Sequence, residues 1–329
     1  MNPSRPKIYD CFCYFNEDML LELRLETLWD HVDYFVIAES RYTQVGDEKP
    51  LNFDSERFAR FRDKIRYLAI DHLPPGEPDM WKNENYQRSY LMHGLHDAAP
   101  DDLVVVSDLD EIPRPECLRQ YDPRRYLRAD LHQYCYAYFL NNRLMDGEGF
   151  ADWIGTRVTS YRHLTQFFGN VNAVRSYKSA GLLRSLKRAW FRRRKVQHIH
   201  DAGWHFSWVT SPEAMILKMK SVADQKFMRD EFQDVAYIES RIRSGQDVLD
   251  RPLRYVPQAL EPRQFPRGIV EARERYARWL IDAPAGAGAT RGRHDAGRSS
   301  RRARGRLAGL TAGFVGRPGA PGSMPRWSA

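Results

Sequence analysis

Three acidic residues, Asp108, Asp110 and Glu111, closely follow the apolar run LVVV at residues 103–106. A short run rich in β-branched residues is typical of a buried strand, and ligands of a parallel α/β sheet bind beyond the carboxyl ends of its strands. Two carboxylates separated by one residue can face the same side, where they supply the oxygen ligands that a hard divalent cation prefers. The spacing therefore predicts a cation site at a strand end, with coordination positions left for a substrate diphosphate.

Two alternatives exist for these acids. The first is a capping and turn cluster, because Pro113 and Pro115 follow directly and a helix can begin there. The second is the nucleophile of an aspartate-dependent phosphohydrolase, which also follows an apolar strand. That motif usually lies near the start of a chain and continues D-x-D-x-[TV], whereas Ile112 fills this place here and the strand is about the fourth. We therefore prefer the metal site to both alternatives.

Strand-like and helix-like segments alternate ahead of the acids. The helix-like segment at residues 17–32 carries Leu21, Leu25, Leu28 and Val32 on one face. Strands are expected at residues 7–15, 33–39, 65–70 and 103–107, and further helices at residues 55–62 and 83–96. This alternation predicts an α/β fold with a mostly parallel central sheet and helices on both of its faces.

The formal net charge of +8 is confined to the end of the 329-residue chain. Residues 284–329 contain nine arginines and one acid, in a sequence rich in Gly, Ala, Pro and Ser that is typical of disorder. The prediction is one folded domain at residues 1–283, formally neutral, and a basic disordered tail at 284–329. A neutral domain argues against a nucleic-acid-binding protein, an alternative that would depend on the arginines of the tail.

The sequence lacks an apolar run near the about 20 residues of a membrane helix, and residues 1–12 do not resemble a signal peptide. We therefore expect a cytoplasmic protein, and the basic tail is a candidate for peripheral contact with the inner membrane surface. The four cysteines are too few and too scattered for a disulfide framework, and we expect them to be packing residues.

Four blocks of the sequence resemble, in the same order, those of glycosyltransferase family 17. They are YFNEDMLLELRLETLWDHVDYFVIAES, SDLDEIPRP, AGWHFSW and YIESRIRSG. The resemblance implies a GT-A-like fold, a nucleotide-sugar donor, a requirement for Mn²⁺ or Mg²⁺ and an inverting mechanism. It also implies transfer of N-acetylglucosamine, from UDP-N-acetylglucosamine, to a hydroxyl of a glycan. A lipid-linked glycan or another cytoplasmic glycan precursor is the expected acceptor.

The resemblance also gives roles to individual residues. Asp110 and Asp108 would be metal ligands, Asp108 would also contact the nucleotide sugar, and Glu111 belongs to the same catalytic block. Glu39 and Ser40, in a block with the pattern ES-x-x-T-x-x-G, would line the nucleotide end of the cleft.

The block AGWHFSW adds two candidates. His205 would be a third metal ligand or a contact to the diphosphate, and the ring of Trp204 could pack on a sugar face. The alternative for His205 is a histidine packed between Trp204 and Trp208, and the sequence leaves both interpretations open.

The sequence offers three candidates for the general base without selecting one of them. They are Asp146, Glu148 and Asp152, which precede the family-like pattern W-x-GT. Such a base must lie on the acceptor side, where it takes the proton of the attacking hydroxyl. Asp152 is the first candidate because its neighbour Trp153 could shape an acceptor pocket.

Overall fold

The computed structural model describes residues 5–76, 79–146, 149–176, 191, 195–221 and 229–283. The predicted tail at 284–329 lies outside these ranges, as does Glu148. Most of residues 184–195, a segment with seven Lys or Arg residues and no acid, also lies outside them. Within the described ranges the strands form two seven-stranded sheets. No helix in this part of the chain is long and apolar enough to cross a membrane.

The first sheet is mostly parallel, as predicted. Its strands, in spatial order, are β12 (Val196–Ile199), β6 (Arg128–Leu131), β11 (Arg157–Ser160), β4 (Leu103–Val106), β1 (Ile8–Cys13), β2 (Tyr34–Ser40) and β3 (Ile65–Ile70). The strands β4, β1, β2 and β3 run parallel to one another, and β12 runs parallel to β6. The exception is β11, which is antiparallel to both β4 and β6.

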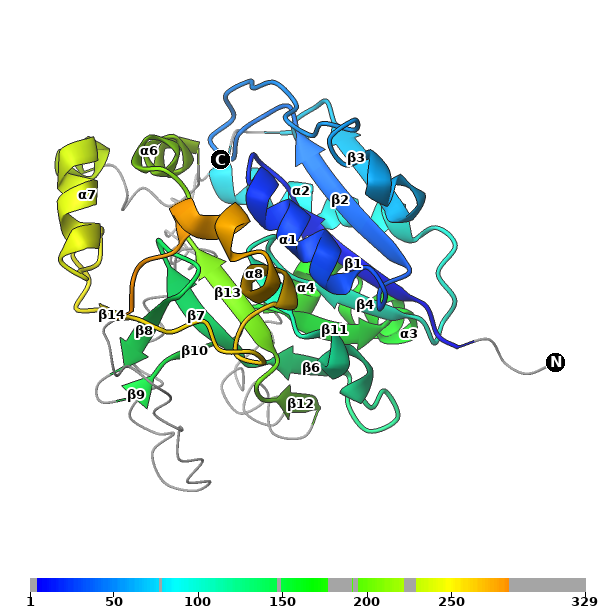
Figure 1. The fold of residues 1–329 in the computed structure, drawn as a ribbon. Helices are drawn as coiled ribbons and strands as arrows, with labels where there is room; N and C mark the ends of the chain where they lie inside the picture. The colour runs from blue at the N-terminus through cyan, green and yellow to red at the C-terminus, as the bar shows by residue number, and fades with distance from the viewer. Residues whose placement is uncertain are drawn as a thin grey trace, which may run out of the picture.

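Helices cover both faces of the first sheet, which also agrees with the prediction. Because strand side chains alternate between faces, Ile8 and Phe12 of β1 pack with α1 (Asp18–Leu28), and Tyr9 and Cys11 pack on the opposite face. The opposite face is covered by α2 (Met80–Tyr90), a 3₁₀ turn at Leu91–Leu95 and α4 (Val171–Ser176). Figure 1 shows α1 and the short α8 (Arg267–Glu271) over one face of the sheet.

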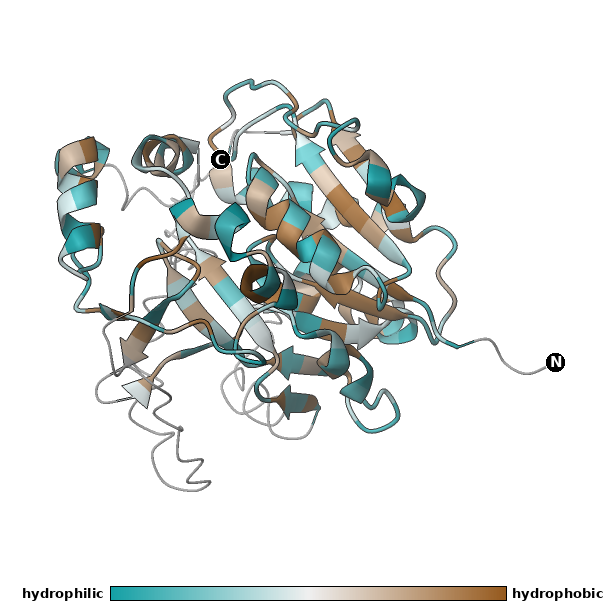
Figure 2. Ribbon diagram, viewed as in Figure 1, coloured by the Kyte–Doolittle hydropathy of each residue, from teal (hydrophilic) through white to brown (hydrophobic). Residues whose placement is uncertain are grey.

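The apolar pattern of the sequence explains this arrangement. Leu21, Leu25 and Leu28 of α1 are fully buried, and Asp18, Glu22 and Glu26 are partly exposed, so the helix shows both hydrophobic and hydrophilic colours in Figure 2. The middle of β2 is hydrophobic, whereas its carboxyl end, at Glu39 and Ser40, is hydrophilic. Polar groups therefore gather where the parallel strands end.

The second sheet was not predicted. Its main strands, in spatial order, are β14 (Arg254–Pro257), β8 (Asn142–Asp146), β7 (Gln133–Ala137), β13 (Gly203–Ser207) and β5 (Glu111–Pro113). Two short strands complete it, β10 (Asp152–Trp153) beside β7 and β9 (Gly149–Phe150) beside β8. The register of β13 places His205 opposite Glu111 on β5 and opposite Cys135 on β7. This sheet therefore brings the AGWHFSW block next to the acidic block.

Candidate active site

A cavity opens at the carboxyl ends of β1, β2 and β4. Its lining includes Cys13 at the end of β1, Ser40 at the end of β2, and Asp108 and Asp110 after β4. Lys218 of helix α6 (Pro212–Ser221) forms part of the opposite wall. The cavity therefore lies where strand order and polarity predict a ligand site.

Arg24 binds the backbone of residues 108–111, the acidic turn. Its Nη1 donates hydrogen bonds to the carbonyl oxygens of Asp108, Leu109 and Glu111, at 3.1, 3.1 and 2.9 Å. Its Nε and Nη2 pair with the carboxylate of Asp10, at 2.7 and 2.6 Å, and both side chains are fully buried. The Arg24 guanidinium uses its N–H donors on both the Asp10 carboxylate and the carbonyl oxygens of the turn. These bonds fix the geometry of the turn.

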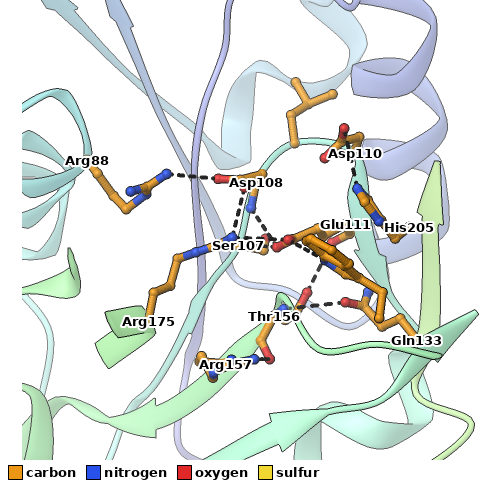
Figure 3. A network of polar contacts seen from close by, with 12 residues as sticks. Arg88, Ser107, Asp108, Asp110, Glu111, Gln133, Thr156, Arg157, Arg175 and His205 are labelled. Carbon is orange, nitrogen blue, oxygen red and sulfur yellow. Dashed lines mark hydrogen bonds and ion pairs between the residues drawn. The ribbon is translucent and has the colours of Figure 1, made fainter. Parts of the chain in front are cut away.

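Two arginines engage the carboxylate of Asp108. Nη2 of Arg88, from α2, lies 3.2 Å from its Oδ1, and Nη2 of Arg175, from α4, lies 2.8 Å from its Oδ2 (Figure 3). Burial alone would raise the pKa of Asp108, but the charges of Arg175 and Arg88 outweigh burial and lower it. Asp108 is therefore an ionised carboxylate with both oxygens already bound.

Glu111 is enclosed by partners. Its Oε1 accepts a hydrogen bond from Nε1 of Trp153 at 2.7 Å, and its Oε2 lies 2.6 Å from Nη1 of Arg175. The backbone of Gly155 passes so close that a Cβ there would lie 1.8 Å from Oε1 of Glu111. This carboxylate is fully buried, and its contacts are those of a group that positions Trp153 and Arg175.

Asp110 differs from the two neighbouring acids. Among the described residues no group donates a hydrogen bond to its carboxylate, and its side chain is only 10% exposed. Its Oδ2 faces Nε2 of His205 at 3.8 Å (Figure 3). Burial raises the pKa of Asp110 to about 7, with Lys218 opposing the shift. The carboxylate is therefore buried without the partners that usually stabilise such a group.

His205 is a neutral imidazole. Burial lowers its pKa to about 4, against the opposing charges of Glu111 and Asp108. Its ring stacks on Trp153 with centroids 4.3 Å apart, and its Nδ1 lies 3.7 Å from Sγ of Cys135. The alternative of a histidine packed between Trp204 and Trp208 does not describe this arrangement, because the stacking partner is Trp153.

The pair formed by Asp110 and His205 fits a divalent cation. Two ligand atoms that are each about 2.1 Å from one ion can lie up to about 4.2 Å apart, and the observed separation is 3.8 Å. A neutral imidazole and a carboxylate without a hydrogen-bond donor are the forms that ligate metals. The fit is poorer for Asp108, whose two oxygens are held by Arg88 and Arg175.

Lys218 was not predicted as a site residue, since the sequence of α6 indicated a structural helix. Its Nζ donates a hydrogen bond to Oε1 of Glu17 at 3.0 Å, and both side chains line the cavity. Burial alone would lower the pKa of Lys218, but Glu17 and Asp110 outweigh burial and raise it. Lys218 is therefore a fixed cation beside Asp110.

Glu111 and His205 are not part of the cavity lining, and neither are two other predicted site residues, Glu39 and Trp204. The carboxylate of Glu39 is fully buried and accepts hydrogen bonds from Nζ of Lys49 at 2.8 Å, from the Asn52 amide at 2.7 Å and from the Tyr67 hydroxyl at 2.9 Å. The ring of Trp204 packs in the core, and its Nε1 donates to a backbone carbonyl at 2.6 Å. These two residues support the fold, whereas Ser40 lines the cavity as expected.

Asp152 also lies away from the cavity lining. It is exposed, whereas its strand neighbour Trp153 is buried against Glu111 and His205. Because successive strand residues face opposite sides, Asp152 points away from the side on which Trp153 meets the site. The structure therefore does not bring the first candidate for the general base to Asp110. Glu148 lies outside the described residues, as does the side chain of Asp146.

Comparisons with known proteins identify the family of this chain. The family model described as Glycosyltransferase family 17 matches residues 1–168, which is more than half of the chain. The chain is therefore a glycosyltransferase. It belongs to glycosyltransferase family 17, and this membership sets the phosphohydrolase alternative aside.

Two curated relatives carry the name beta-1,4-mannosyl-glycoprotein 4-beta-N-acetylglucosaminyltransferase. The rat protein is 29% identical over 255 residues, which cover 69% of this chain and 45% of the relative. The human protein is 27% identical over 295 residues, which cover 80% of this chain and 53% of the relative. The chain spans about half the length of the curated relatives it matches.

Solved structures give weaker similarities. A 4-diphosphocytidyl-2C-methyl-D-erythritol synthase is 16% identical with a TM-score of 0.36, covering 65% of this chain and 98% of that chain. The glycosyltransferase GlyE of Streptococcus pneumoniae is 13% identical with a TM-score of 0.30, covering 60% of this chain and 46% of that chain. TM-scores of this size do not establish a shared fold.

Proposed function

We propose that this chain is an inverting, metal-dependent transferase that moves N-acetylglucosamine from UDP-N-acetylglucosamine to a hydroxyl of a glycan. The observation that carries the proposal is the buried Asp110 carboxylate, which lacks a hydrogen-bond donor and faces Nε2 of His205 at 3.8 Å. Asp110 lies beyond the carboxyl end of β4 in a mostly parallel sheet. We propose that this sheet forms a GT-A-like domain that binds the nucleotide sugar.

Asp110 and His205 would hold the cation, Mn²⁺ or Mg²⁺. A bound ion would neutralise the negative charge that develops on the departing nucleoside diphosphate. Asp108 keeps Arg88 and Arg175 beside this position, and in the arrangement observed it orders these cations rather than ligating the metal.

Fixed cations of the chain support binding of an anionic donor. Lys218, Lys49 and Arg88 line the cavity, and each is held by an acid, with Lys218 on Glu17 and Lys49 on Glu39. Such preorganised cations can bind phosphate oxygens without first being ordered. We propose that Lys218, beside Asp110, contacts the diphosphate.

The base that deprotonates the acceptor must be a carboxylate that reaches the cavity. Glu111 does not meet this requirement because Trp153 and Arg175 bind its two oxygens, and Asp152 points away from the site. Beyond the acidic turn, the acids of the described part of the chain that line the cavity are Glu17 and Glu84. Burial raises the pKa of Glu84, which favours proton uptake, and we propose Glu84 as the first candidate to test.

The acceptor and the place of action are also proposals. The name of the relatives specifies a mannosyl glycoprotein, and we propose a sugar hydroxyl of a glycan or of a lipid-linked glycan for this chain. We propose that it acts in the cytoplasm, with the basic tail as a contact to the membrane surface.

A direct test is donor hydrolysis and product linkage. Nucleotide sugars are screened with and without Mn²⁺ for release of the nucleoside diphosphate, and the anomeric signal of the transferred sugar is then read by proton NMR. We expect UDP-N-acetylglucosamine to be the preferred donor and the product linkage to be β. An α linkage would refute the single displacement, and equal rates after complete metal removal would refute the cation.

A further inference from the structure

A second group of metal-ligand side chains lies outside the cavity. His132, Asp152 and His200 each offer one ligand atom, and these atoms all lie within 4.8 Å of one another. The group includes none of the residues that line the cavity, and the proposed transfer reaction does not use it. Its residue types, two imidazoles and one carboxylate, are those of many zinc sites.

Pairing of the strands brings the three residues together. The strands β6 and β12 run parallel with Leu131 opposite Ile199, so the chain leaves them side by side at His132 and His200. The two imidazole rings have centroids 4.1 Å apart. Asp152 arrives through β10, where it lies opposite Tyr134 of β7. Because β7 begins at Gln133, directly after His132, this pairing brings Asp152 close to His132.

The backbone around the group is already fixed. The amide of His132 donates to the carbonyl of Ile199 at 2.8 Å, and the amide of Ala202 donates to the carbonyl of His132 at 2.8 Å. Arg114 binds Asp201, the residue after His200. Its Nε donates a hydrogen bond to the carbonyl oxygen of Asp201 at 2.9 Å, and its Nη2 donates one to Oδ1 at 2.9 Å. A cation binding here would need to order little of the main chain.

A third histidine supports the imidazole of His132. Nδ1 of His198, on β12, lies 3.0 Å from Nε2 of His132, a contact of the kind that orients metal-binding histidines. The contact leaves Nδ1 of His132 as the ring nitrogen not engaged by His198.

We propose that His132, Asp152 and His200 form a Zn²⁺ site, separate from the cation site at Asp110. Three protein ligands leave one tetrahedral position for water. A donor set of two nitrogens and one oxygen favours Zn²⁺ over Mg²⁺ or Mn²⁺, which prefer oxygen ligands and bind such sites more weakly. The two sites would therefore select different metals.

Zn²⁺ at this site would tie three separate segments together and would support one wall of the cavity. Asp152 is next to Trp153, whose indole binds Glu111 and stacks on His205. Holding β10 in place therefore holds the ring against which His205 packs. The site therefore has a structural role, and we expect Zn²⁺ to raise the melting temperature of the chain.

The test uses the full chain without a histidine tag, stripped of metal. Zn²⁺ is titrated by calorimetry, and Co²⁺ is titrated as a spectroscopic probe whose visible absorption reports tetrahedral coordination. Asp152→Asn and His200→Gln change exposed residues, so both variants should fold. We expect each to weaken Zn²⁺ binding by at least about 10-fold, and to remove the increase in melting temperature that Zn²⁺ gives the unchanged chain.

Two controls locate the binding. His31→Gln removes an exposed histidine elsewhere and should leave Zn²⁺ affinity unchanged. Asp110→Asn should also leave it unchanged while weakening Mn²⁺-dependent binding of UDP. The proposal is overturned if the unchanged chain binds no Zn²⁺. It is equally overturned if Asp152→Asn and His200→Gln bind Zn²⁺ like the unchanged chain, or if only Asp110→Asn loses it. Because UDP binding is measured separately, failure of this site leaves the proposed transfer function untouched.

Discussion

His205 and Asp110 face each other across two paired strands, with 3.8 Å between Nε2 and Oδ2. The amide of Phe206 donates a hydrogen bond to the carbonyl of Asp110 at 2.8 Å, and His205 is in register with Glu111. The two proposed ligands therefore come from separate parts of the sequence but lie close together where β5 begins beside β13.

The first prediction concerns Asp110. Asp110→Asn keeps the size of the side chain and removes its charge, so Mn²⁺-dependent binding of UDP should fall at least about 100-fold and transfer should be lost. The fold should persist, because no described residue donates a hydrogen bond to this carboxylate. Calorimetry with UDP and Mn²⁺ measures the binding. Asp101→Asn, at an acid whose side chain is 79% exposed, is the matched control, and unchanged binding in Asp110→Asn would remove this residue from the site.

The second prediction separates two roles of His205. If it is a ligand, His205→Asn should raise the Mn²⁺ concentration required for half-maximal activity by about 10-fold or more. Loss of the ring that stacks on Trp153 should also lower the melting temperature. A metal titration of activity is run beside a melting curve of the same protein. A lower melting temperature with an unchanged metal requirement would mean that His205 only packs.

The third prediction concerns Arg24. Arg24→Lys keeps one positive charge but loses the planar group that binds Asp10 and three carbonyl oxygens. We expect the free energy of unfolding to fall by about 3 kcal/mol, with weaker UDP binding because the acidic turn loosens. Urea denaturation measures the first effect. Arg57→Lys, in a partly exposed ion pair with Asp18, should change stability by less than about 1 kcal/mol, and equal losses in both variants would contradict this role.

The fourth prediction concerns Gly155. A methyl group there would overlap Oε1 of Glu111, so Gly155→Ala should move Glu111 and with it Arg175 and Trp153. We expect a loss of about 1 to 3 kcal/mol in stability together with reduced transfer. Gly169→Ala is a useful comparison, because a Cβ at Gly169 meets nothing within 4 Å although its φ is +83°. That variant should lose stability through its backbone alone and keep metal-dependent UDP binding.

The fifth prediction concerns pH and the thiols. Burial raises the pKa of Cys13 and of Cys135 to about 12, and that of Cys117 to about 11. Because these values lie above the usual value near 9, the thiols stay protonated up to pH 9, and any stability that they contribute is lost as pH rises above 9. Alkylation by iodoacetamide at pH 8, followed by mass spectrometry, should be slow for the folded chain and fast in urea. Rapid alkylation of folded Cys13, which lines the cavity, would contradict this prediction.

The first sheet could be predicted because its strands are short apolar runs that alternate with helices. The second sheet could not, since β5, β10 and β14 are brief and are defined by partners that lie far away in the sequence. Residue type and block singled out Asp110 and His205, which the structure places 3.8 Å apart, and their role as metal ligands stays a prediction. Glu39 and Trp204 were misplaced in the cavity, because polarity and aromaticity do not reveal which face of a strand a residue occupies.

Arg24 was missed although the sequence contains a sign of it. It lies between Leu21, Leu25 and Leu28 at helical spacing, so a charged residue interrupts the apolar face of α1. A cation in that position requires a buried partner, and Asp10 on the preceding strand supplies it. Arg88 carried no comparable sign, because polar residues surround it in the sequence.

The placement of Asp110 beside β13 has a mechanical consequence. Neighbouring strands linked by backbone hydrogen bonds slide and twist as one ribbon, so thermal motion of the second sheet moves Asp110 and His205 in the same direction. The spacing of the two groups is then insensitive to bending of the surrounding domain. The ion pair between Lys218 and Glu17 ties α6 to the same side of the cavity, so an incoming diphosphate would meet groups whose separations are set before it arrives.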